Sequence, residues 1–77
     1  MSDIAEKISK VFVSKLYVHP NQVTPAASLA DLAVTKFDLI QTYSALEHQF
    51  GIEITDRDVV SLHTVEDVVM LIRRKLH

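Results

Sequence analysis

The 77-residue sequence contains no cysteine, only one glycine and two prolines, and its net charge at pH 7 is only -2. Without cysteine the chain can form no disulfide, thiol nucleophile or cysteine-based zinc site, which is compatible with a reducing cytosol. The small charge argues against a nucleic-acid partner, since nucleic-acid-binding proteins usually carry a basic excess. We therefore expect a cytoplasmic protein that does not bind nucleic acid.

Several other signals are also missing. No apolar stretch approaches the roughly 20 residues that a transmembrane helix requires, and residues 1–7 lack the basic and apolar regions of a signal peptide. There is no glycine-rich phosphate loop, and no pair of carboxylates placed for acid–base catalysis. These absences predict an unprocessed protein with no membrane span.

The chain is short, and hydrophobic residues make up 48% of it. This composition predicts one folded domain over residues 1–77 and not a disordered tail. A domain of this size has too few residues to wall a deep catalytic cleft. We expect a monomer that is not an enzyme.

Apolar residues recur with the spacing of amphipathic helices in three stretches. The first begins near the candidate N-cap Ser2, the second begins at Thr35 and stops at the single glycine, Gly51, and the last follows Thr64. The expected buried positions are Ile4, Ile8, Val11, Phe12 and Leu16 in the first helix, Leu39, Tyr43, Leu46 and Phe50 with flanking Ile40 in the second, and Val65, Val68, Val69, Ile72 and Leu76 in the last.

The spacing Thr-x-x-Asp occurs three times, and each occurrence predicts a capping box at a helix start. The three pairs are Thr35 with Asp38, Thr55 with Asp58, and Thr64 with Asp67. The second pair predicts a short helix in which Val59, Val60 and Leu62 provide the apolar contacts. The basic residues 73–75 fall at the end of the last helix, where cations favour the carbonyl end of the helix dipole.

Residues 17–34 are predicted to form a long loop with at most a short turn. Pro20 and Pro25 disfavour helical geometry in the residues that precede them. Val23, Leu29 and Leu32 can pin such a loop to the core. The predicted fold class is thus all-α: a small four-helix bundle with a long loop between the first two helices and a short third helix.

Two segments carry a family resemblance over nearly the whole chain. The pair Asp31-Leu32 precedes the second helix, and Ala45-Leu46-Glu47 leads through Phe50-Gly51 to Ile54. With the order of the elements, these segments resemble the acyl carrier proteins. The resemblance implies a place in a fatty-acid, polyketide or related pathway. It also implies acyl-transferring or condensing enzymes as partners, and a 4′-phosphopantetheine arm on a serine at the start of the second helix.

The attachment serine of that family is replaced in this sequence. Where the family pattern is Asp-Ser-Leu-Asp, this chain has Thr35-Lys36-Phe37-Asp38. Lys36 offers no hydroxyl to form a phosphodiester. We therefore expect no cofactor, no covalent phosphopantetheine and a protein that acts through protein contacts.

Two alternatives to this expectation remain. The first is a working carrier modified at the neighbouring hydroxyl of Thr35. Against it, that hydroxyl is expected to cap the helix, is crowded by its β-branch and points about 100° away round the helix. The second is a structural or regulatory subunit that shares only the fold.

A helical wheel places a candidate partner-binding face opposite the buried stripe of the second helix. Phe37 is either a partner anchor on this face or a cover for the loop. Only Asp38 and Glu47, at the edges, keep the acidic character that the resemblance implies, so attraction to basic partners should be weaker. The four histidines are scattered, and we expect no metal site. The candidate partner-binding residues are Lys36, Phe37, Gln41, Ser44 and His48.

Overall fold

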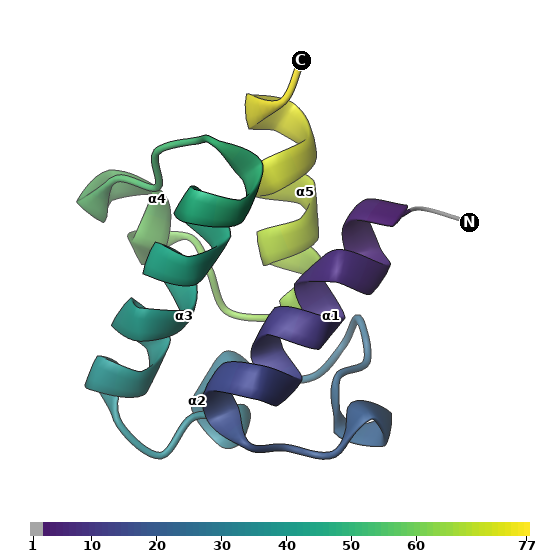
Figure 1. Cartoon of the computed structure of the whole chain (residues 1–77). Helices are drawn as coiled ribbons and strands as arrows, with labels where there is room; N and C mark the ends of the chain where they lie inside the picture. The colour runs from purple at the N-terminus through teal and green to yellow at the C-terminus, as the bar shows by residue number, and fades with distance from the viewer. Residues whose placement is uncertain (1–2) are drawn as a thin grey trace.

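A computed structural model describes residues 3–77, and its elements are all helical (Figure 1). The elements are α1 (Asp3–Leu16), the 3-10 turn η1 (Pro20–Gln22), α2 (Leu29–Leu32), α3 (Lys36–Phe50), α4 (Asp56–Val60) and α5 (Val65–Lys75). The all-α prediction is confirmed, and α1, α3 and α5 are the three long helices. The candidate cap Ser2 lies outside the described residues. No helix within residues 3–77 has the length and apolar character needed to cross a membrane.

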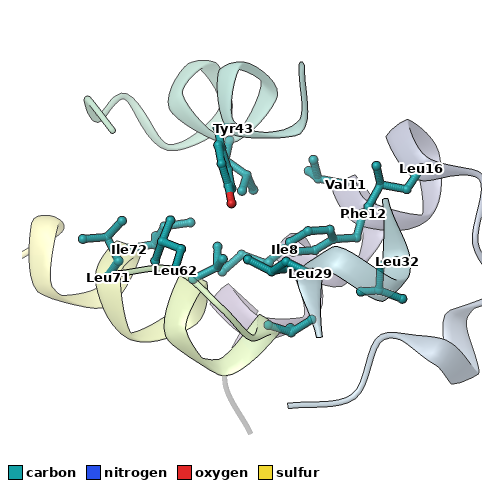
Figure 2. Close-up of a cluster of buried hydrophobic side chains, with 13 residues drawn as sticks. Ile8, Val11, Phe12, Leu16, Leu29, Leu32, Tyr43, Leu62, Leu71 and Ile72 are labelled. Atoms are coloured by element: carbon teal, nitrogen blue, oxygen red, sulfur yellow. The ribbon is translucent and has the colours of Figure 1, made fainter. Parts of the chain in front are cut away.

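The core lies between α1, α3 and α5. Ile8, Phe12 and Leu46 are completely buried, as their helical spacing predicts. In Figure 2, Tyr43 of α3 points toward Leu62, Leu71 and Ile72, and Phe12 of α1 lies among the buried side chains. Helix α1 therefore packs against both α3 and α5, and Tyr43 extends from α3 toward Leu71 and Ile72 of α5. This packing fixes where the outer face of α3 lies.

Three positions expected to be buried are exposed instead. Ile40 is 58% exposed, Val60 76% and Leu76 43%. Ile40 lies on the outer side of α3, Val60 ends the five-residue α4, and Leu76 lies beyond the last turn of α5. Conversely, Leu71 was not predicted to be buried but is only 3% exposed.

The connection between α1 and α3 is more ordered than the predicted loop. It contains η1 and α2, and Leu29 and Leu32 are buried, as expected of residues that pin it. Ser28 forms an isolated antiparallel bridge with Thr64. Around this bridge, the N–H of Leu29 donates to the carbonyl of His63 (2.9 Å), and the N–H of Val65 donates to that of Ala27 (3.1 Å). Main-chain bonds thus tie the connection to the start of α5.

Helix α1 ends on a tyrosine in the left-handed conformation. Tyr17 has φ 56° and is 92% exposed, and its N–H donates to the carbonyl of Val13 (3.1 Å). Glycine usually occupies this position, because a side chain costs about 1–2 kcal/mol in left-handed geometry.

Tyr17→Gly should therefore stabilise the protein. We expect an increase of about 0.5–1 kcal/mol in the free energy of unfolding. The gain is smaller than the backbone strain that is removed, because glycine also gives the unfolded chain more conformational freedom. Urea denaturation measures it. Tyr17→Ala is the matched control, since it removes the same exposed ring but keeps the strain, and it should stay within about 0.5 kcal/mol of wild type. An equal gain in both variants would contradict the assignment of strain to this residue.

Helices α4 and α5 are joined by an ion pair. Lys75 Nζ lies 2.7 Å from Asp58 Oδ2, and this carboxylate also accepts the N–H of Thr55 (2.9 Å). The Lys75 hydrogen bond, followed by the Thr55 N–H, lowers the pKa of Asp58 from 3.8 to about 2. The pKa of Asp67 is lowered as well, by the N–H groups of His63 and Thr64.

These two carboxylates predict a loss of stability in acid. Both pKa values are lower in the folded state than in the unfolded chain. The two carboxylates therefore contribute fully to the free energy of unfolding above about pH 4, and this contribution disappears as the pH falls toward 2. Thermal melts between pH 6 and about pH 2 should show the midpoint falling across this window. Asp58→Asn should flatten the fall, and an unchanged profile in that variant would assign the loss to other groups.

Candidate functional site

The entrance to α3 is fixed by a reciprocal cap. Thr35 has extended geometry and its hydroxyl oxygen accepts the N–H of Asp38 (3.2 Å), while Asp38 Oδ2 accepts the N–H of Thr35 (3.0 Å). This is the capping box that the spacing predicted, and Thr55 and Thr64 form the same arrangement at α4 and α5. The start of α3 is therefore defined by its own sequence.

Lys36 is the first residue of α3 and is exposed. Its position beside free helix N–H groups is unfavourable for a cation, at a cost of about 0.3–1 kcal/mol. The neighbouring Thr35 is also exposed. At the entrance to α3, therefore, Lys36, where the resemblance places the attachment serine, offers an amine, and Thr35 before it offers a hydroxyl.

Removing the Thr35 hydroxyl should weaken this entrance. Thr35→Ala leaves the N–H of Asp38 without its side-chain partner, and we expect a loss of about 1 kcal/mol in the free energy of unfolding. Thr35→Ser keeps the hydroxyl, and because serine caps helices at least as well as threonine, its free energy of unfolding should stay within about 0.5 kcal/mol of wild type. Denaturant titrations of both variants measure the difference. Equal losses would mean that the hydroxyl contributes nothing as a cap.

The outer face of α3 borders a shallow groove of about 690 Å³. Four of the five candidate partner-binding residues line it, namely Phe37, Gln41, Ser44 and His48, whereas Lys36 does not. Helical spacing therefore identified most of one side of the groove. It did not identify Ile40, which follows Phe37 by one turn, or Lys15 of α1, which only tertiary packing brings to this face.

The acidic side chains of α3 are engaged with the main chain. Asp38 caps the helix start, and Glu47 Oε2 accepts the N–H of Ile54 (2.8 Å) beyond the helix end. Gly51, at φ 64°, turns the chain there, as expected for a left-handed helix stop. Neither carboxylate lines the groove, so its polar groups come mainly from amide, hydroxyl, imidazole and ammonium side chains.

Within residues 3–77, no three histidine, aspartate or glutamate side chains come together in a group suited to a metal ion. His48 lines the groove, and His19 Nδ1 accepts the N–H of Asn21 (3.2 Å) at the start of η1. The expectation of no metal site stays a prediction.

Comparison with known proteins shows the family of this chain. The family model described as "Phosphopantetheine attachment site" matches residues 6–72. The chain is 40% identical over 76 residues to an acyl carrier protein of Thermosynechococcus vestitus, covering 97% of this chain and 94% of the relative. It is 44% identical over 73 residues to an acyl carrier protein of Zymomonas mobilis, covering 94% of each. The chain belongs to the acyl carrier protein family.

This membership corrects the expectation about the cofactor. We predicted none, but the matched family is defined by phosphopantetheine attachment, so 4′-phosphopantetheine is its characteristic group. The prediction inferred the absence of the group from the replaced residues 35–37, above all Lys36, whereas the family match covers residues 6–72. At the entrance to α3, the amine of Lys36 does not fit a phosphodiester. The neighbouring hydroxyl is that of Thr35.

Proposed function

We propose that this chain serves a fatty-acid, polyketide or related pathway by docking on acyl-transferring or condensing enzymes through the outer face of α3. In this proposal it is a cytoplasmic monomer that performs no catalysis itself. The observation that supports docking is the exposure of two large apolar side chains one turn apart, Phe37 at 63% and Ile40 at 58%.

These two side chains have the properties of interface anchors. Fully burying a large apolar side chain contributes about 1.5–3 kcal/mol. Both residues line the same groove, and polar side chains such as Gln41 and Ser44 surround them. An apolar centre with a polar rim is the usual anatomy of a protein interface.

Affinity capture from cells that make the protein tests the proposal. Wild type should retain acyl-transferring or condensing enzymes that mass spectrometry identifies, and Phe37→Ala/Ile40→Ala should lose most of them. Val60→Ala is the matched control, since Val60 is an exposed apolar residue on α4 and does not line this groove. Capture of unrelated proteins alone would favour a structural or regulatory subunit that shares only the fold.

A second candidate is a working carrier that holds phosphopantetheine on Thr35. Family membership favours it, together with an exposed hydroxyl at the entrance to α3. In the cap, the Thr35 oxygen acts as an acceptor, so its proton is not used in that bond. The β-branch and the shift of one residue from the family position make it a poorer nucleophile than the family's serine.

Intact-mass measurement after incubation with coenzyme A and a broad-specificity transferase tests this second candidate. An adduct should appear on wild type and disappear in Thr35→Ala. If wild type stays unmodified, Thr35 is not an attachment site under the assay, and the docking proposal is then judged by the capture experiment alone.

A further inference from the structure

The groove beside α3 continues along α1. A second hollow of about 260 Å³ is lined by Lys10, Val11, Ser14, Lys15, Ala45 and Gln49. It shares Lys15, Ala45 and Gln49 with the larger hollow, so the two hollows adjoin, and together they are here named the α1–α3 groove. Figure 1 shows α1 and α3 running alongside each other in opposite directions, and the two helices pack together.

The charged side chains that line the α1–α3 groove are two lysines. Lys10 and Lys15 are both exposed, and the linings of the two hollows include no aspartate or glutamate. His48 also lines the larger hollow. Asp38 and Glu47 of α3 accept main-chain N–H groups and line neither hollow. The nearest carboxylate on α1 is that of Glu6, one turn from Lys10, and it lines an adjoining hollow.

The apolar side chains of the groove line the same hollows as the two lysines. Phe37 and Ile40 lie on α3, one turn apart, and Val11 and Ala45 line the junction with α1. An amphipathic helix that lies in a groove places its apolar stripe on such residues and its polar flanks beside the rim. Here part of the rim is cationic, so favourable flanks carry carboxylates.

We propose that the α1–α3 groove binds an acidic amphipathic helix of a partner enzyme, with its apolar side on Phe37 and Ile40 and its carboxylates beside Lys10 and Lys15. This inference rests on the proposed docking function and adds the charge and shape of the partner surface. It is opposite in sign to the acidic docking face that the sequence resemblance implied.

Two synthetic helices test the charge preference. Both carry the same leucine and phenylalanine stripe over 18 residues, and their flanking positions are all glutamate in one and all lysine in the other. Each is titrated into the ¹⁵N-labelled full chain while amide resonances are followed. The glutamate helix should shift resonances along the groove and bind about tenfold more tightly than the lysine helix at low salt. Raising the salt concentration should reduce the difference.

Charge reversal then locates the site. Lys10→Glu/Lys15→Glu should weaken binding of the glutamate helix about tenfold, because it removes two attractions and adds two repulsions. Arg73→Glu/Arg74→Glu is the matched control, with the same change in net charge on exposed residues that do not line the groove. This control should leave the affinity for the glutamate helix within about twofold of the wild-type value. Circular dichroism confirms that both variants are folded before they are compared.

Three results would overturn the proposal: equal or tighter binding of the lysine helix, shifts confined to another face, or groove shifts that appear on raising the protein concentration without peptide. The last would identify a second copy as the occupant. Because these titrations use no enzyme, they can fail while the capture experiment succeeds. In that case docking through α3 stands and only the acidic partner surface is rejected.

Discussion

Phe12→Ala is expected to lower the free energy of unfolding by about 3–5 kcal/mol, the range for a fully buried aromatic side chain. The Phe12 ring is completely buried near the centre of the α1 stripe, and Figure 2 shows it beside Ile8 of α1 and Leu29 of α2. A domain of this length has a total stability of about 4–12 kcal/mol. The substitution should therefore remove a large fraction of the stability, and a substantial unfolded population is expected at 37 °C.

Phe37→Ala is the matched control for this prediction. It removes the same ring from a side chain that is 63% exposed, so its effect on unfolding should stay within about 0.5 kcal/mol. Urea denaturation monitored by circular dichroism measures both variants. The pair separates the two roles of phenylalanine in this chain, since Phe12→Ala should affect folding and Phe37→Ala should affect docking. Similar losses in both would show that Phe37 covers the loop instead of serving as an anchor.

Lys36→Ser combined with Thr35→Asp is expected to make residue 36 a substrate for a phosphopantetheinyl transferase. The double change introduces, at the start of α3, the acid and the serine of the pattern that the sequence resemblance implies. A serine there is exposed, free of a β-branch and beside the helix N-terminus, which favours the negative charge of a phosphodiester. Removing the lysine charge from the first turn should also stabilise α3 by about 0.3–1 kcal/mol.

Intact mass and peptide mapping measure the outcome of this substitution. The adduct should be complete and should map to residue 36, whereas Lys36→Ala with the same Thr35→Asp change should acquire none at that position. An unmodified Lys36→Ser/Thr35→Asp variant would show that the transferase no longer recognises the surrounding face. Adding Phe37→Leu would then test whether the bulk of Phe37 blocks it.

The sequence predicted the long helices well because their signals are local. Helical spacing identifies a buried stripe, and each Thr-x-x-Asp cap satisfies groups within four residues of one another. The errors occur where burial depends on another element. Ile40, Val60 and Leu76 are apolar but have no neighbouring element to cover them, and Leu71 is buried because of how α5 packs.

The site was predicted only on the side that belongs to α3. Residues three and four apart on one helix are neighbours, so Gln41, Ser44 and His48 could be grouped with Phe37 from the sequence alone. Lys10 and Lys15 are far from them in the sequence, and the packing of α1 on α3 brings them to the same groove. A helical wheel of α3 cannot show the charge that a second helix contributes.

The short main-chain bridge between Ser28 and Thr64 has a consequence for the order of folding. It joins segments that are distant in the sequence, so the chain must close a long loop before the bridge forms. Helices with local contacts form faster than such pairings. The bridge and α2 beside it are therefore expected to be among the last parts to assemble. Slow refolding of α2 would leave α3 formed while the chain that leads into it is still free to move.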